Sequence, residues 1–331
     1  MGSRYDIREV VVGLPQAPAY NGVFFMSLSD RLTGLLGNSS FVFTLAIIVG
    51  LIFNGGASWT EPALLPVLAI IMTISILDVS SRIFLNLRTV LLPVLTALLL
   101  SYGILGVILI GLSSLIINDP ELRSGFVLVA AVPPAVAVIP LTHLLGGNTE
   151  FSLVGNVVAY VAALAVTPLI CILFLGANFI DPVRLLIVLS ELIVAPILVS
   201  RILRRTRIVT TVDRWRNPVV NWGFFLVIYT MVGLNRDVFL GQPYTLLLTC
   251  AIAFTGTFVF GELINRILEF LGMAKGDRIS LILFGTRKNY GLAGAIGLIF
   301  FSSRAAMPAA VVSAMSVLHF IWLSWRIKRM H

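Results

Sequence analysis

The sequence predicts an all-α membrane protein with about ten transmembrane helices, and three observations support this fold class. Hydrophobic residues make up 58% of the 331 residues and charged residues 11%, and the mean hydropathy is +1.02, whereas soluble domains carry about 25% charged residues. Apolar stretches of roughly the 20 residues that a bilayer requires follow one another along the chain. The breaks between them are short and turn-like, which leaves no room for a soluble domain.

The elements are expected in the following order. Residues 1–37 carry charges and prolines without the apolar core of a signal peptide, so we expect a cytoplasmic or interfacial segment there. The spans are predicted near residues 38–54, 62–79, 89–116, 124–145, 150–176, 182–203, 217–234, 243–268, 278–301 and 304–325.

The chain is predicted to divide into two halves at a basic segment. We assign residues 38–200 to a first repeat of about five spans and residues 201–216 to a basic cytoplasmic loop. Residues 217–325 hold the remaining spans of a second repeat whose first span is 182–203, and 326–331 form a basic cytoplasmic tail.

The positions of the Lys and Arg residues indicate how the chain is oriented in the membrane. The net charge is +8, but the basic residues lie between apolar spans, for example at Arg204, Arg205 and Arg207, so we expect no nucleic-acid partner. Loops of one parity hold most of the Lys and Arg, which predicts a multi-pass protein of the plasma (inner) membrane with both termini cytoplasmic. Cys171 and Cys250 fall inside apolar runs, so neither a disulfide framework nor a metal site is indicated.

Two spans are interrupted at corresponding places in the two halves. The stretch 284–296 is polar and glycine-broken and carries Arg287 and Lys288, each of which costs about 2.5–3.5 kcal/mol near mid-bilayer. The stretch 130–140 contains three prolines, which break helical hydrogen bonds. Paired broken spans mark the binding site of a secondary transporter built from inverted repeats.

The candidate site residues follow from these breaks. We expect substrate to be bound by Lys288, Arg287, Asn289, Thr286, Pro134 and His143. For some of them a structural role stays open: Pro134 shapes the break, and His143 hydrogen-bonds at a helix end. Glu262 is either part of an ion site or interfacial, because Arg266 follows one turn later.

Several motifs, in collinear order over most of residues 40–325, resemble the bile acid:sodium symporter family. Asn289-Tyr-Gly-Leu-Ala293 is similar to the Asn-Ser-Gly-Leu-Ala of the family's second crossover helix. Further similar stretches are Leu68–Leu77, Leu141–Asn148, Leu164–Pro168 and Ser316–His319. The resemblance implies two five-span inverted repeats, with a core domain that contains two crossing discontinuous helices and a smaller panel domain. Substrate would lie between them.

The chain departs from this family where the sodium ligands stand. Phe284 or Leu283 replaces the family's glutamate, Lys288 replaces its glutamine, and a serine-asparagine pair aligns with Val138 and Ile139. Ser152 and Asn156 are what remains of the ion site, with Glu262 as a further candidate. Because a hard cation needs several converging oxygens, we predict that Na⁺ is absent.

Lys288, with or without Arg287, is expected to supply the positive charge that sodium supplies in relatives. Alternatively, these cations face the substrate, or Lys288 carries a proton, so proton coupling stays open. No other cofactor is indicated.

The sequence thus predicts a transporter that moves a small organic anion, such as a carboxylate, a sulfate conjugate or a bile-acid-like molecule, by alternating access. The alternatives are a sodium-coupled organic anion symporter with altered ion sites, a cation/proton antiporter of related fold, and an anion receptor that does not transport. An enzyme is not expected, because the spans lack a Ser/His, paired Asp or metal motif. The predicted partners are the anion and the lipid bilayer, and the oligomeric state stays open.

Overall fold

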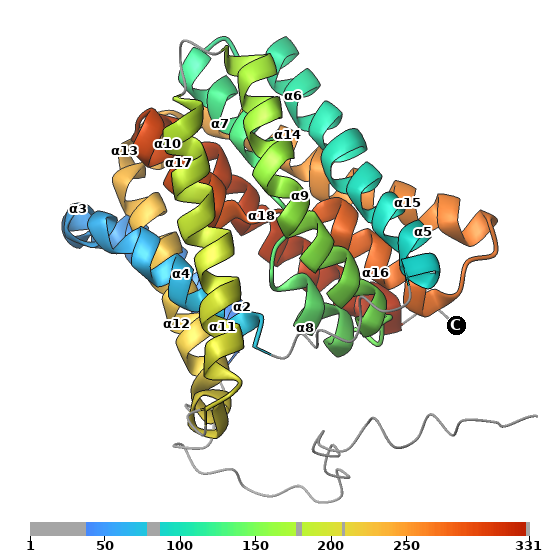
Figure 1. The fold of residues 1–331 in the computed structure, drawn as a ribbon. Coiled ribbons are helices and arrows are strands. Elements are labelled where there is room, and N and C mark those ends of the chain that lie inside the picture. Colours follow the sequence, from blue (N-terminus) through green and yellow to red (C-terminus); the bar gives the residue numbers. More distant parts are fainter. Residues whose placement is uncertain (1–37, 78–86, 177–180, 207–208, 329–331) are drawn as a thin grey trace, which may run out of the picture.

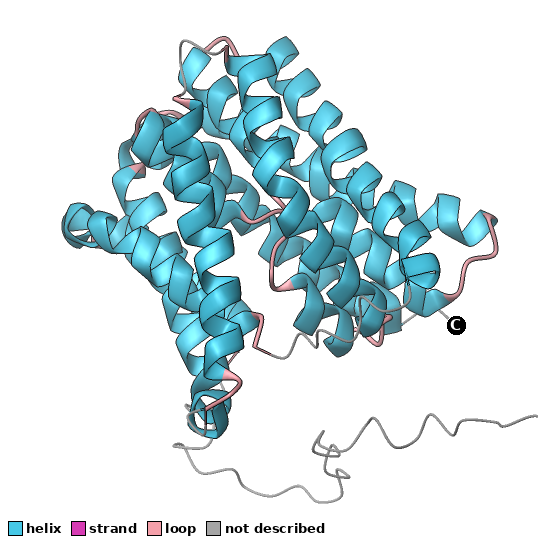
Figure 2. Ribbon diagram, viewed as in Figure 1, coloured by secondary structure: helices cyan, strands magenta, loops and turns pink. Residues whose placement is uncertain are grey.

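The computed structural model describes residues 38–77, 87–176, 181–206 and 209–328. Within these ranges the regular structure is helical, and no strand is formed (Figure 2). The predicted segment 1–37 lies outside the described residues. The first half contains α2 (Ser39–Ile52), η2 (Asn54–Gly56), α3 (Ala57–Thr60), η3 (Glu61–Ala63), α4 (Leu64–Ser75), α5 (Leu87–Leu98), η5 (Leu99–Ile104), α6 (Leu105–Ile116), α7 (Pro120–Ala131), α8 (Val138–Leu144) and α9 (Thr149–Leu175).

The second half continues with helices of similar length. It contains α10 (Pro182–Leu189), η6 (Ser190–Val194), α11 (Ala195–Leu203), α12 (Val209–Leu234), α13 (Arg236–Gly241), α14 (Pro243–Phe254), η7 (Thr255–Val259), α15 (Phe260–Phe270), α16 (Lys275–Thr286), α17 (Tyr290–Phe300) and α18 (Ser303–Lys328). Helix α12 begins within the segment 201–216 that the sequence assigns to a loop.

Six helical stretches in the described part of the chain are long and apolar enough to cross a membrane. They are Asn54–Ser75, Val94–Ile116, Thr149–Leu175, Val183–Leu203, Pro243–Phe270 and Ser303–Ile327. Three shorter apolar helices are Phe41–Ile52, Pro218–Leu234 and Tyr290–Phe300. The prediction of a multi-pass helical membrane protein is therefore confirmed.

The helices form two groups that lie side by side (Figure 1). In the small group, α12 packs against α2 and α4, and α11 packs against α4. In the large group, α7 and α17 pack against α18, and α9 packs against α5, α7 and α8. Helix α16 is nearly surrounded, and its residues 278–286 are all buried.

Small residues allow the buried helices to approach closely. A Cβ added to Gly125 of α7 would lie 2.2 Å from the Ala305 carbonyl oxygen of α18, and a Cβ on Gly297 of α17 would lie 3.1 Å from the Ala306 backbone. Glycine at such positions lets the helix backbones touch, as is common between membrane helices. This packing holds α7 and α17 against α18, close to the break that follows α7 and the break that precedes α17.

Polar contacts hold both ends of the large group. Asp119 caps α7 by accepting hydrogen bonds from the amides of Glu121 and Leu122 at 2.9 and 3.2 Å, and it forms an ion pair with Arg304 of α18 at 2.5 Å. Between α8 and α9, the Asn148 side chain donates to the Asp277 carboxylate of α16 at 2.7 Å. These contacts tie α7 to α18, and the segment between α8 and α9 to α16, away from the breaks.

Candidate functional site

The two helix breaks lie against each other inside the large group. Residues 132–137 separate α7 from α8, and residues 287–289 separate α16 from α17. The breaks pair as an antiparallel bridge between Pro134 and Lys288. The Asn289 amide donates to the Pro133 carbonyl at 2.8 Å, and the Ala135 amide donates to the Arg287 carbonyl at 3.3 Å. We call this pair of breaks the crossing.

Lys288 is fully buried at the crossing. Its Nζ donates to the carbonyl oxygens of Ala130 and Val132, both at 2.9 Å, and lies 4.1 Å from the centroid of the Tyr102 ring. The carbonyls belong to the end of α7, where helical acceptors lose their intrahelical partners. These three contacts are all with acceptors. An ammonium has three donors and no acceptor, so Lys288 can donate to both carbonyls at once.

Arg287 points away from Lys288. The backbone at Arg287 is extended, with φ −122° and ψ 117°, and neighbouring side chains in extended backbone face opposite sides. Its Nη2 donates to the Ser316 carbonyl at 2.7 Å, and its guanidinium lies 5.4 Å from the centroid of the Phe320 ring. Arg287 thus binds α18, whereas Lys288 binds α7.

Asn289 caps α17 and connects it to α9. Its Oδ1 accepts a hydrogen bond from the Leu292 amide at 3.1 Å, which satisfies a free donor at the helix start. Its Nδ2 donates to the Tyr160 hydroxyl at 3.0 Å. Thr286 is buried beside Arg287, and its hydroxyl donates to the Ile282 carbonyl at 2.7 Å within its own helix.

Helix α9 brings Asn156 and Ser152 to the first break. The Asn156 Nδ2 donates to the Ala135 carbonyl at 3.2 Å, and its Oδ1 is buried without a hydrogen-bond partner in the described structure. The Ser152 hydroxyl bonds the Thr142 hydroxyl of α8 at 2.8 Å. The predicted pair therefore binds the unwound backbone and the helix that follows it.

The two remaining predicted residues have their contacts elsewhere. His143 is exposed near the end of α8. Glu262 accepts hydrogen bonds from Arg266 at 3.0 Å and from Arg326 at 2.9 Å. Its environment is that of an ion pair between α15 and α18. Pro134, by contrast, is part of the bridge at the crossing.

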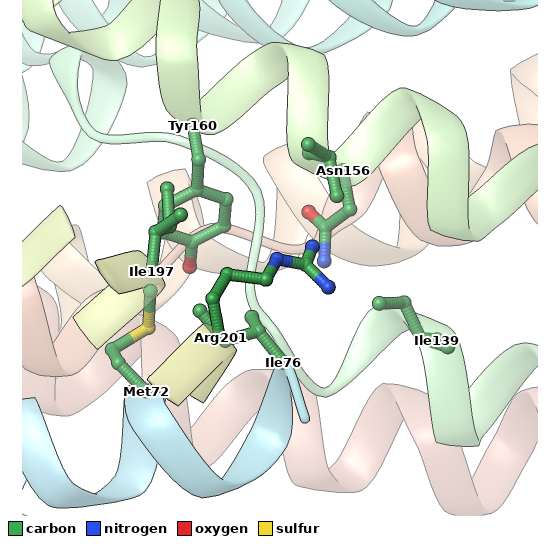
Figure 3. A pocket seen from close by; sticks show the side chains of 8 residues that line it. Met72, Ile76, Ile139, Asn156, Tyr160, Ile197 and Arg201 are labelled. Atoms are coloured by element: carbon green, nitrogen blue, oxygen red, sulfur yellow. The ribbon is translucent and has the colours of Figure 1, made fainter. Parts of the chain in front are cut away.

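A pocket lies beside the crossing, between the two helix groups (Figure 3). It contains ≈ 430 Å³ of empty space, part of which is open to solvent. Its lining is largely apolar and comes from α4, α8, α9 and α11: Met72, Ile76, Ile139, Asn156, Val157, Tyr160, Ile197 and Arg201. Since Asn156 and Tyr160 also bind the crossing, a molecule in the pocket would contact groups that hold the two breaks together.

The sequence did not single out Tyr102, Tyr160 or Arg201. Tyr160 follows Asn156 by four residues, so it lies on the helix face already marked by Ser152, and this periodicity is a signal that finds it. No sequence signal distinguishes Tyr102 from the other aromatic residues of the apolar spans. Arg201 stands at the end of a span, where a basic residue is explained by membrane topology alone.

Comparison with known families decides the class of this protein. The sequence model of the SBF-like CPA transporter family matches residues 79–323, which include both breaks and α9. The chain belongs to the SBF-like CPA transporter family. The resemblance to bile acid:sodium symporters is thereby confirmed at the level of the family. As a member of a transporter family with several membrane-spanning helices, the protein is a membrane transporter and not an enzyme.

This SBF-like transporter is also similar to a curated protein of Bacillus subtilis (strain 168). The two sequences are 25% identical over 226 residues, which cover 66% of this chain and 68% of the relative. The relative is named an uncharacterized sodium-dependent transporter, YocS.

Proposed function

We propose that this SBF-like transporter moves a small organic anion by alternating access, independently of Na⁺, with Lys288 and Arg287 supplying the positive charge at the crossing. The observation that carries the proposal is the Lys288 ammonium bound to two main-chain carbonyls at 2.9 Å. Carbonyl oxygens at unwound membrane helices are the groups that coordinate Na⁺ in secondary transporters.

The donor set at the crossing does not fit a sodium ion. The carbonyls of Ala130 and Val132 accept hydrogen bonds from Lys288, and the Ala135 carbonyl accepts one from Asn156. A hard cation needs several free oxygens. It would also be repelled by the ammonium, by about 4 kcal/mol at 4 Å with an effective dielectric constant of 20.

The charge at the crossing supports an anionic substrate. The contacts of Lys288 and Arg287 in the described structure are with carbonyls and aromatic rings rather than carboxylates. Two cations in a low-dielectric interior attract a mobile anion to the neighbouring pocket. Because most of the pocket lining is apolar, the anion is expected to have an organic body.

The order of elements supports two inverted repeats of five spans. Each half contains a long helix with a π-helical segment, then an interrupted helix, then a long helix with an internal proline: α5–η5–α6, α7–α8 and α9, and then α14–η7–α15, α16–α17 and α18. We assign the large group to the core domain and the small group to the panel domain that moves against it. The positions of Lys and Arg support a plasma (inner) membrane location with both termini cytoplasmic.

Sodium-coupled symport is the second candidate, because the relative from Bacillus subtilis is named as sodium-dependent. A cation/proton antiporter is the third, since the family name includes the CPA label. A receptor that binds an anion without moving it is a fourth candidate.

Uptake into proteoliposomes tests the proposal. Labelled carboxylates, sulfates and sterol conjugates are supplied with an inward Na⁺ gradient or with choline in place of Na⁺, and protein-free liposomes give the background. We expect uptake of at least one anion at equal rates in both conditions. Strong stimulation by Na⁺ contradicts sodium independence, and proton release on addition of Na⁺ without anion uptake supports the antiporter instead. Binding without uptake supports the receptor.

A further inference from the structure

We propose that Arg201 recognises the anionic group of the substrate, and that the substrate carries a hydroxyl or N–H donor on an apolar body. The inference rests on the proposed transport of an organic anion and specifies the chemistry of that anion. It concerns the pocket between the helix groups and a residue that neither the breaks nor the sodium positions indicate.

Arg201 enters the pocket from the small helix group. It lies in the last turn of α11 and lines the pocket together with Asn156 and Tyr160 of α9, which belong to the large group. Figure 3 shows its side chain extended toward Asn156. A planar guanidinium binds a carboxylate or sulfate with two parallel hydrogen bonds, which gives both affinity and orientation.

The other two candidate cations do not line this pocket. Lys288 is bound by the carbonyls at the end of α7, and Arg287 is bound by α18 on the other side of the second break. Their charges act on the pocket from a distance. Among the lining residues that the structure describes, Arg201 is the one with a cationic side chain, and we assign the direct contact with the anionic group to it.

Asn156 indicates the second feature of the ligand. Its Nδ2 is occupied by the Ala135 carbonyl, and its Oδ1 is buried and accepts no hydrogen bond in the described structure. More than about 90% of buried polar groups have a partner, so this acceptor calls for a donor. A carboxylate has none to offer. A hydroxyl or N–H group elsewhere on the substrate satisfies the Oδ1.

The rest of the lining fits a branched or cyclic hydrocarbon body. Five apolar side chains contact the empty space, and they come from both helix groups: Met72, Ile76, Ile139, Val157 and Ile197. A ligand whose anionic end contacts α11 and whose donor contacts α9 would join the two groups. Its binding would therefore favour one relative position of the groups over the other, as alternating access requires.

Two probe anions that differ by one hydroxyl test the inference: 2-hydroxy-4-methylpentanoate and 4-methylpentanoate. Their binding to detergent-solubilised full-length protein is followed by thermal stabilisation over a concentration series. The variants are Arg201→Gln, Arg201→Lys and, as a matched control, Arg205→Gln, which makes the same charge change at an exposed residue beyond the end of α11.

We expect the hydroxy acid to bind wild type about 5-fold more tightly than its partner, since it satisfies a buried acceptor. Arg201→Gln should weaken binding of both anions about 10- to 100-fold, because a charge-assisted hydrogen bond is lost. The affinity of Arg201→Lys for both anions should lie between those of wild type and Arg201→Gln. Arg205→Gln should bind both anions as tightly as wild type does.

Each of the other outcomes overturns a specific part of the inference. Equal binding of both anions by wild type overturns the assignment of Asn156, and unchanged binding by Arg201→Gln overturns that of Arg201. If neither probe binds while proteoliposomes take up other anions, the proposed ligand chemistry of the pocket is wrong and the transport function stands. If no anion is taken up or bound, the proposed function itself fails.

Discussion

The ammonium of Lys288 faces the ring of Tyr102, with Nζ 4.1 Å from the ring centroid. Tyr102 lies in the π-helical segment η5, and such widened turns are frequent at functional sites. The hydroxyl of Tyr102 donates to the Ala159 carbonyl of α9 at 3.2 Å, which fixes the ring. Three separate elements, η5, the end of α7 and the second break, therefore meet at one nitrogen atom.

This relationship predicts different effects for two substitutions of Tyr102. Tyr102→Phe keeps the ring beneath the ammonium and loses the hydroxyl, whereas Tyr102→Leu loses both. A cation–π contact of a desolvated cation contributes about 1–2 kcal/mol, so the free energy of unfolding should be lower by that amount in the Leu variant than in the Phe variant. Unfolding by SDS in mixed micelles measures the difference. Equal stability of the two variants would show that the ring contributes nothing to holding Lys288.

Removing the ammonium should create a sodium response that the wild type lacks. Lys288→Ala frees the carbonyls of Ala130 and Val132 and removes the repelling charge. For a dissociation constant near 1 mM, 100 mM NaCl should stabilise this variant by about 2.7 kcal/mol relative to choline chloride. Thermal unfolding in the two salts measures the effect.

The controls for this experiment are Lys275→Ala, which removes an exposed lysine, and Lys288→Gln, which keeps a donor at the same position. Lys275→Ala should respond to Na⁺ no more than wild type does. If wild type and Lys288→Ala respond equally, the ammonium does not stand in the place of an ion.

The contact between α7 and α18 predicts that Gly125→Ala is strongly destabilising. The added methyl carbon would lie 2.2 Å from the Ala305 carbonyl oxygen and 2.8 Å from the Pro308 Cγ. Overpacking of this kind costs about 1–3 kcal/mol, and here the clash is with backbone, which cannot rotate away. Gly111→Ala in α6 is the control, because no atom lies within 4 Å of its added Cβ. A normal midpoint of thermal unfolding for Gly125→Ala would refute the close approach of α7 to α18.

The ion pair between Asp119 and Arg304 should couple α7 to α18 energetically. The two side chains are 25% and 33% exposed, whereas the pair formed by Arg236 and Asp237 spans 4.0 Å and leaves the Asp237 side chain 98% exposed. A double-mutant cycle with Asp119→Asn and Arg304→Gln should give a coupling energy of about 1–2 kcal/mol. The same cycle on the exposed pair should give about 0–0.5 kcal/mol. Equal values for both cycles would contradict a structural role for Arg304.

The sequence was informative where local chemistry decides the structure. Each proline removes one helical hydrogen bond, and the helix is interrupted around the adjacent Pro133 and Pro134 as predicted. Single prolines, by contrast, are accommodated inside α9 and α18. Buried charge needs polar surroundings, and Lys288 was a candidate for this reason before its carbonyl partners were known. The breaks, the helical class and the family all follow from such local signals.

The direction of each side chain at the crossing depended on tertiary structure. Lys288 and Arg287 are adjacent, and only the extended backbone between α16 and α17 decides that one faces α7 and the other α18. The pocket arises where α11 and α9 approach each other, so nothing near Arg201 in the sequence reveals it. The π-helical segments likewise have no pattern that distinguishes them from ordinary helix.

The contact between Lys288 and the Ala130 carbonyl joins residues 158 positions apart, and this separation has a consequence for biosynthesis. Chains emerge from the ribosome N-terminus first, so the free carbonyls of α7 enter the bilayer well before Arg287 and Lys288 are translated. Placing those cations in lipid alone costs about 2.5–3.5 kcal/mol each. The late segment is therefore expected to remain beside the translocon until it docks against these carbonyls.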